Sequence, residues 1–231
     1  MSEIDLSSFD ALTFDCYGTL IDWERGILNA LQPVLSPQAI DVDEDELLER
    51  YAKHEAALEA GEYLAYREIL ARSLRELCAD LGFTPSDDDV AEFSESVGVW
   101  PAFGDSASAL RRLAERFKLG VITNCDDDLF ARSNKRLGVT FDWIVSAQTA
   151  RSHKPSLNNF EVAFNTIEVP RERILHVAQS LFHDHVPAKQ LGLRTVWINR
   201  RHDKPGFGAT PEANATPDLT VPDMRTFAEL A

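Results

Sequence analysis

The stretch ALTFDCYGTLID, residues 11–22, joins a buried strand to an acidic turn. Its apolar first half predicts a short strand over residues 11–15, and this strand ends on a single carboxylate, Asp15. The chain then turns at Gly18. An aspartate at the end of a strand is most often a turn or capping residue, so its role depends on what else the fold brings to the same place.

The composition is that of an acidic globular protein. The chain has 231 residues, of which 44% are hydrophobic and 26% charged, enough for one sizeable core or for a core domain with a smaller companion. Acids outnumber bases 38 to 23, and the formal charge of −15 argues against nucleic-acid and membrane partners. The acidic N-terminus does not resemble a signal peptide, and the three scattered cysteines fit the reducing cytoplasm.

Two kinds of pattern divide the chain. Residues 24–98 show helical periodicity and no convincing strand. From residue 104 onward strands alternate with helices, which is typical of parallel β-α-β units with helices on both faces of the sheet. The predicted fold class is therefore α/β, a Rossmann-like parallel sheet formed by residues 1–23 and 99–231, with residues 24–98 inserted as a helical domain.

The later elements can be placed by the same patterns. A helix capped by Asp105 is expected before the second strand, and a short helix is expected to end the chain. The other predicted elements are strands over 119–123, 141–146, 174–178, 194–198 and 219–221, and helices over 126–137, 157–167 and 184–191.

Four of the predicted strand ends supply polar residues. In an open parallel sheet, ligands bind in the crevice beyond the carboxyl ends of the strands, so these residues are expected to lie close together. They form a set of two carboxylates, one cation and several hydrogen-bonding groups: Asp15, Tyr17 and Thr19, then Thr123 and Asn124, then Lys154, then Gln179, Ser180 and Asp184.

Four short segments carry a family resemblance. FDCYGT (14–19), ITN (122–124), HKP (153–155) and HVAQSLFHD (176–184) resemble, in order and spacing, the four motifs of the haloacid dehalogenase superfamily. The insertion over 24–98 resembles that superfamily's helical cap domain. The resemblance covers nearly the whole chain, and it implies that Asp15 is a nucleophile that forms a covalent intermediate.

Two positions indicate which branch of the superfamily the chain resembles. Phosphatases of the superfamily carry acids at the positions of Tyr17 and Gln179, and these acids protonate the leaving group and help to hold Mg²⁺. An amide oxygen is a weaker ligand for Mg²⁺, and a phenol is a poor general acid near neutral pH. The chain is instead similar to the 2-haloacid dehalogenases, which implies that it uses no metal and no other cofactor.

The resemblance implies a role for each site residue. Asp15 would displace halide from a short 2-haloalkanoic acid, a small anionic substrate, and the resulting ester would be hydrolysed by water. Lys154 would hold Asp15 ionised, and Asp184 would position or activate the water. The resemblance also implies a homodimer, and it implies that the substrate is bound by Tyr17, Thr19, Thr123, Asn124 and Ser180.

Two alternative functions remain open. One is a small-molecule phosphatase with a degraded Mg²⁺ site, and the other is a non-catalytic binding module. The dehalogenase branch also uses a cap arginine to grip the substrate, for which the candidates here are Arg25, Arg50 and Arg67, and the branch has a tyrosine where this chain has Phe160.

Neither of two further groups of residues is expected to hold a metal. The acids of 126–128 are expected in the first turn of a helix, where they complement its dipole. His183 and His185 are close in sequence to His176, but His176 lies inside a predicted apolar strand, which separates it from the other two.

Overall fold

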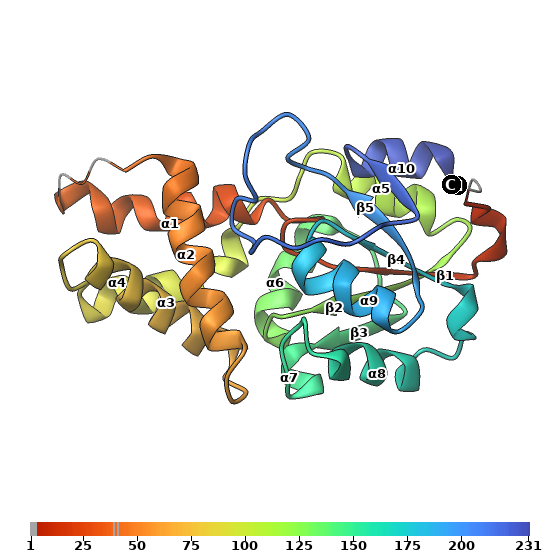
Figure 1. Cartoon of the computed structure of the whole chain (residues 1–231), viewed down its shortest axis with the longest axis horizontal. Helices are drawn as coiled ribbons and strands as arrows, with labels where there is room; N and C mark the ends of the chain where they lie inside the picture. The colour runs from red at the N-terminus through yellow and green to blue at the C-terminus, as the bar shows by residue number, and fades with distance from the viewer. Residues whose placement is uncertain (1–3, 39, 41) are drawn as a thin grey trace.

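Within residues 4–38, 40 and 42–231, which the computed structural model describes, six parallel strands form one sheet in the order β3-β2-β1-β4-β5-β6 (Figure 1). This confirms the predicted α/β fold class, and the predicted strand bounds agree closely with the observed ones. The strands are β1 Ala11–Phe14, β2 Lys118–Thr123, β3 Trp143–Ser146, β4 Ile174–Ala178, β5 Arg194–Ile198 and β6 Leu219–Val221.

The helices precede, connect and cover these strands. The α-helices are α1 Trp23–Leu35, α2 Glu44–Glu59, α3 Tyr66–Asp80, α4 Asp87–Glu95, α5 Ser106–Leu113, α6 Asp127–Leu137, α7 Ala147–Ala150, α8 Leu157–Thr166, α9 Val186–Gln190 and α10 Met224–Leu230.

None of the described helices combines the length and the hydropathy needed to cross a bilayer. The predicted cytoplasmic location and the predicted homodimer stay predictions.

Strand β1 lies at the centre of the sheet, between β2 and β4. All four of its side chains are buried, as expected for a parallel strand with helices on both faces. The chain proceeds from β1 through β2 to β3 on one side and from β4 through β5 to β6 on the other, so the strand order reverses beside β1. A reversal of this kind opens a crevice at the carboxyl ends of the strands, which is where Asp15 follows β1.

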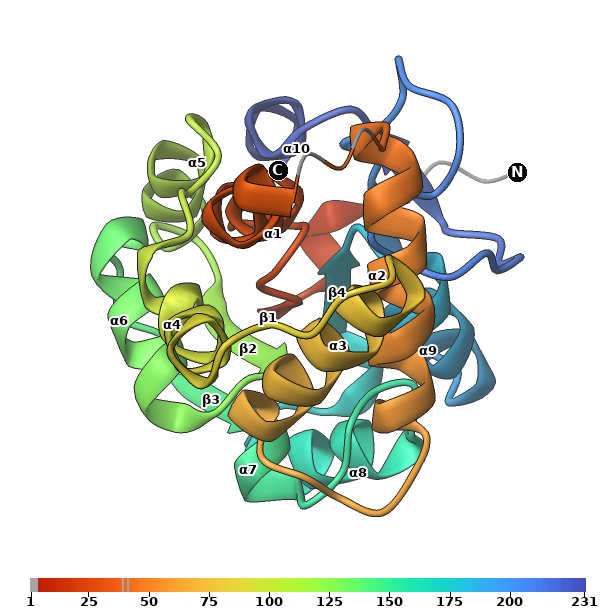
Figure 2. The same ribbon diagram turned by 90° about the vertical axis from the view of Figure 1, so that its left-hand side faces the viewer.

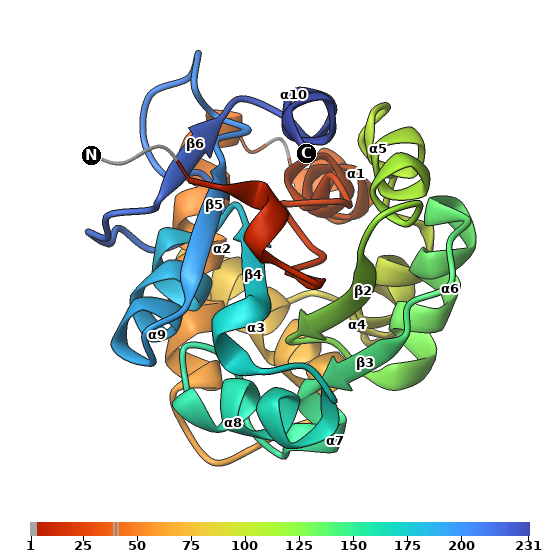
Figure 3. The same cartoon turned by 90° about the vertical axis from the view of Figure 1, so that its right-hand side faces the viewer.

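Helices pack on the two faces of the sheet through separate apolar clusters (Figure 3). On one face, the apolar side chains of α8 and α9 pack with Ala11 and Ile122. On the other face, α5, α6 and α10 share a cluster with Leu12 and Phe14. Because side chains alternate along a strand, neighbouring residues of β1 contribute to opposite clusters.

Helices α1–α4 lie together beyond the carboxyl end of the sheet (Figures 1 and 2). Their starts are fixed by side chains that accept backbone N–H groups, including Asp22 for α1, Asp43 for α2 and a reciprocal capping box at Ser86 for α4. Leucines of α2 and α3 pack in the same apolar cluster as β1, so this group of helices is anchored on the sheet domain. The division into a core over 1–23 and 99–231 and a cap over 24–98 stays a prediction.

Two details of the predicted elements were wrong. The helix predicted over 184–191 is preceded by a π-helical turn, Leu181–His185, and only then becomes α9. Asp105 does not cap its own helix, because its Oδ2 accepts hydrogen bonds from the backbone N–H groups of Met224 and Arg225 at the start of α10. The same oxygen accepts a hydrogen bond from Arg200. A carboxylate caps whichever helix start the fold brings nearest, which sequence spacing does not show.

Replacement of Asp105 by alanine is expected to lower the free energy of unfolding by about 2–4 kcal/mol, because two backbone N–H groups and a guanidinium lose a buried acceptor. Urea denaturation followed by circular dichroism measures this change. The exposed Asp203 provides the control, since its replacement by alanine is expected to change stability by about 0.5 kcal/mol or less. Equal stabilities of the two variants would contradict the role given to Asp105.

Candidate active site

The turn after β1 fixes the carboxylate of Asp15. The hydroxyl of Thr19 donates a hydrogen bond of 2.7 Å to Asp15 Oδ2, and it accepts one of 2.9 Å from the backbone N–H of Gln179. The second bond leaves the hydroxyl hydrogen free to point at Asp15. Gly18 has φ +93°, and a side chain there would also press on Trp23 and on Gln179, so the turn requires glycine.

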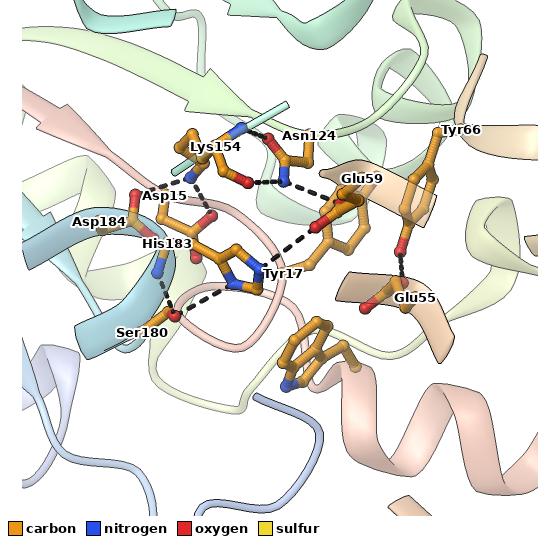
Figure 4. Close-up of a pocket in the computed structure, with 11 residues that line it drawn as sticks. Asp15, Tyr17, Glu55, Glu59, Tyr66, Asn124, Lys154, Ser180, His183 and Asp184 are labelled. Atoms are coloured by element: carbon orange, nitrogen blue, oxygen red, sulfur yellow. Dashed lines mark hydrogen bonds and ion pairs between the residues drawn. The ribbon is translucent and has the colours of Figure 1, made fainter. Parts of the chain in front are cut away.

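Lys154 joins Asp15 to Asp184. Its side chain is 1% exposed, and its ammonium donates to Asp15 Oδ1 at 2.8 Å, to Asp184 Oδ1 at 2.7 Å and to the carbonyl oxygen of Ile122 at 2.9 Å (Figure 4). An ammonium has three N–H donors, so all of them are used. The two carboxylates hold the pKa of Lys154 above its ordinary value despite burial, and the lysine is therefore a permanent cation.

Asn124 fixes the backbone of Lys154. The amide oxygen of Asn124 accepts from the Lys154 N–H at 2.7 Å, and the amide nitrogen donates to the Lys154 carbonyl oxygen at 3.0 Å. This two-sided contact joins the end of β2 to the loop that carries the lysine. The predicted site residue Asn124 thus lies in the site, where it orients Lys154.

The two aspartates respond differently to the shared ammonium. Burial raises the pKa of Asp15, and the neighbouring charge of Asp184 adds to this more than Lys154 and Thr19 can offset. For Asp184, burial is outweighed by Lys154 and by His176, so its pKa lies below the ordinary range. As pH falls, the first proton taken up by this coupled pair therefore goes to Asp15.

His176 supports Asp184 from behind. Its Nε2 lies 3.0 Å from Asp184 Oδ1, and its Nδ1 lies 2.9 Å from the hydroxyl of Thr13. Sequence reasoning did not place His176 in the site. The register of β4 against β1 sets it beside Thr13, and the turn Leu181–His185 brings Asp184 back over it. Phe160 packs edge-on against the same imidazole.

A small cavity of about 30 Å³, with room for water, lies over Asp15 (Figure 4). Its walls come from both parts of the chain. The sheet domain supplies Asp15, Tyr17, Asn124, Lys154, Ser180, His183 and Asp184, and helices α1–α3 supply Trp23, Glu55, Glu59 and Tyr66.

Glu59 connects α2 to the sheet domain. Its Oε1 accepts a hydrogen bond of 2.9 Å from the amide of Asn124. Its Oε2 lies 3.2 Å from Nε2 of His183, close enough for an ion pair but not in hydrogen-bond geometry. Burial disfavours a charge on His183, but Glu59 outweighs this and raises the pKa of the histidine above its ordinary value.

Glu55 is the second acid that α2 contributes. Its Oε1 accepts hydrogen bonds from the hydroxyls of Tyr51 and Tyr66, at 3.0 and 2.8 Å. Burial and the charge of Glu59 raise the pKa of Glu55 to about 7. Sequence reasoning missed both acids. Both acids follow Tyr51 at intervals of four residues and therefore lie on the buried side of α2. Two acids on an otherwise apolar helix face are unusual, and this pattern could have indicated them from the sequence.

The other predicted binding residues have mixed positions. Tyr17 lines the cavity, but its hydroxyl hydrogen bonds with Ser133 of α6 at 3.0 Å. Ser180 also lines the cavity and hydrogen bonds with His183 at 3.1 Å. Thr123 is buried at the end of β2, does not line the cavity, and has no hydrogen-bond partner for its hydroxyl within the described part of the chain.

None of the candidate cap arginines lines the cavity. Arg25 is exposed, Arg50 pairs with Glu46 on its own helix, and Arg67 pairs with Glu95 and Asp128. Asp126 accepts the backbone N–H groups of Tyr66 and Arg67 at the start of α3, so acids of 126–128 hold the helical layer rather than cluster on their own. No group of three or more potential metal ligands occurs among the described residues.

Comparison with known proteins identifies the family of this chain. The model of the haloacid dehalogenase-like hydrolases matches residues 9–184. The chain belongs to this family. Among its relatives, haloacetate dehalogenase H-2 of Moraxella sp. (strain B) is 27% identical over 97% of this chain and 99% of the relative, and the (S)-2-haloacid dehalogenase of Pseudomonas putida is 26% identical over 98% and 96%.

The fold of this haloacid dehalogenase-like hydrolase is shared with solved structures. The L-2-haloacid dehalogenase of Xanthobacter autotrophicus superposes with a TM-score of 0.79, covering 96% of this chain and 98% of that one at 19% identity. The family, the fold and the class of hydrolase inferred from the four motifs are thereby confirmed. The individual roles of the site residues stay predictions.

Removal of the Thr19 hydroxyl by Thr19→Val is expected to raise the pKa of Asp15 further, because the donor stabilises the ionised carboxylate. The titration midpoint then moves to higher pH, and the fraction of ionised nucleophile in mildly acidic solution falls. The measurement is a ¹³C NMR titration of the labelled Asp15 carboxyl, assigned with Asp15→Asn. Ser133→Ala is the control and is expected to leave the midpoint in place, because the Ser133 hydroxyl bonds with Tyr17 and with the carbonyl oxygen of Val97 but not with Asp15. An unmoved or lower midpoint in Thr19→Val contradicts the assignment.

Proposed function

We propose that this chain is a metal-independent hydrolase of the dehalogenase type, in which Asp15 displaces halide from a saturated carbon. One observation carries the proposal. Each oxygen of Asp15 is oriented by a single donor, Lys154 or Thr19, while the hydroxyl of Tyr17 is bound to Ser133. A nucleophile is therefore fixed in place without the neighbouring acid that a phosphoryl or alkoxide leaving group needs.

The proposed reaction has two steps. An Asp15 oxygen forms a bond to the substrate carbon while the carbon–halogen bond breaks, and halide leaves with the electron pair. Water then adds to the carbonyl carbon of the Asp15 ester, the product alcohol departs, and one proton is released. The names of the relatives support a short 2-haloalkanoic acid, or a close derivative of one, as the substrate.

Asp184 is proposed to orient the hydrolytic water. Its Oδ2 is buried and receives no hydrogen bond from the described residues, so it is free to accept one from water. The low pKa of Asp184 makes it a weak base, and this favours positioning of the water over removal of its proton. His176 and Lys154 hold the other oxygen and thereby fix the direction of the free one.

The donor set around Asp15 is a poor fit for Mg²⁺. One oxygen each of Asp15 and Asp184 already accepts from the ammonium of Lys154. The nearby position 179 supplies an amide, and Mg²⁺ favours several hard anionic oxygens in an octahedral arrangement. This supports the dehalogenase proposal over the phosphatase alternative.

Halide release from 2-chloropropionate and 2-chloropropionamide in the presence of EDTA tests the proposal. Turnover is expected to fall by at least about 10³-fold in Asp15→Asn, because the amide is a far weaker nucleophile. In H₂¹⁸O, mass spectrometry is expected to find the label in Asp15, since water adds to its ester.

Matched controls separate the alternatives. Asp203→Asn, an exposed substitution of the same type, is expected to retain wild-type turnover. Phosphate released from p-nitrophenyl phosphate only when Mg²⁺ is added would establish the phosphatase alternative instead. Neither halide nor phosphate release, with no ¹⁸O in Asp15, would favour a binding module.

A further inference from the structure

The cavity over Asp15 contains more acids than free cations. Asp15, Asp184, Glu55 and Glu59 line it, and its cationic groups are Lys154 and His183. Of the residues that the structure describes, no arginine reaches its walls. Acids are rarely buried together unless cations or donors are arranged around them, so the charge balance of this cavity bears on what can enter it.

Both cations are already committed to carboxylates of the protein. The three N–H donors of Lys154 are taken by Asp15, by Asp184 and by a backbone carbonyl. His183 hydrogen bonds through Nδ1 with Ser180, and its Nε2 faces Glu59 at 3.2 Å. A substrate carboxylate that entered the cavity would therefore find no free cation to pair with, and it would lie beside two protein carboxylates.

The cavity does contain acceptors that receive no hydrogen bond. Glu59 is 8% exposed, and its buried Oε2 faces Nε2 of His183 at 3.2 Å but receives no hydrogen bond within the described part of the chain. Glu55 receives both of its tyrosine hydrogen bonds on Oε1, so its other oxygen is also without a donor among the described residues. Buried acceptors of this kind recognise a ligand that brings N–H donors.

We infer that this cavity selects a substrate whose polar end is an uncharged hydrogen-bond donor, such as the carboxamide of a 2-haloalkanoic acid, with Glu59 as the specificity-determining acceptor. The inference rests on the proposed function, because it describes the group attached to the carbon that Asp15 attacks. A carboxamide keeps the carbonyl group beside that carbon and replaces the anionic oxygen with N–H donors. The site thus discriminates by leaving a carboxylate unpaired as well as by binding an amide.

The closing experiment compares 2-chloropropionamide with 2-chloropropionate, which share the reacting carbon and the leaving group. The kcat/KM for the amide is divided by the kcat/KM for the acid. This ratio is then divided by the same ratio for the uncatalysed displacement of chloride by acetate ion in water, which removes the difference in intrinsic reactivity between the two compounds. The corrected ratio is expected to favour the amide at least about tenfold in the wild-type protein. It is expected to fall at least about fivefold in Glu59→Gln, which removes the charge and lets the side chain donate to a carboxylate.

Glu62→Gln is the matched control, because Glu62 is exposed, lies three residues further along and changes the net charge equally. This variant is expected to keep the wild-type ratio. A corrected ratio that favours the acid, or that is the same in the wild-type protein and Glu59→Gln, overturns the inference.

Binding of unreactive analogues makes the outcome independent of turnover. Propionamide is expected to bind the wild-type protein at least about tenfold more tightly than propionate, as measured by NMR titration, and this preference is expected to be lost in Glu59→Gln. Tighter binding of propionate overturns the inference even if Asp15 proves to be a nucleophile. Preference for propionamide without halide release from any substrate upholds the selectivity and overturns the proposed function.

Discussion

The ammonium of Lys154, buried between Asp15 and Asp184, is the interaction on which the site depends. It connects the end of β1, the carbonyl oxygen of Ile122 in β2 and the turn after β4. Without the lysine, two carboxylates would be left buried and uncompensated, and breaking a buried pair of this kind typically costs about 3–5 kcal/mol. The same interaction that stabilises the crevice therefore also favours the ionised form of the proposed nucleophile, against the effect of burial.

Much of this arrangement could be predicted from the sequence. The strands are short apolar runs bounded by polar turns, and the carboxyl ends of parallel strands necessarily meet at one edge of the sheet. That rule places Asp15, Lys154 and Asp184 together without any knowledge of side-chain contacts. The later comparisons confirmed the family that the four motifs around these residues indicated.

Other features lie outside what sequence periodicity can show. Periodicity does not show that His176 belongs to the site, because an apolar strand normally buries its side chains among apolar neighbours. The register of β4 against β1 and the turn after β4 instead supply Thr13 and Asp184 as polar partners. Asp105 caps α10 because of a long-range contact that follows from tertiary packing alone. The acids of α2 occupy helical positions that predict burial, but the pattern does not show what faces them across the cavity.

The amide of Asn124 has a consequence for how the helical layer rests on the sheet. One of its hydrogens is bound by the Lys154 carbonyl oxygen and another by Glu59, while its oxygen accepts the Lys154 N–H. An amide is the one ordinary side chain that can both donate twice and accept at such a point. The lysine contacts do not involve α2, so the alignment of Asp15 with its cation is set within the sheet domain and does not depend on Glu59. A carboxylate at position 124 would repel Glu59 and could donate to neither oxygen, so the amide at this position is what ties α2 to the loop that carries Lys154.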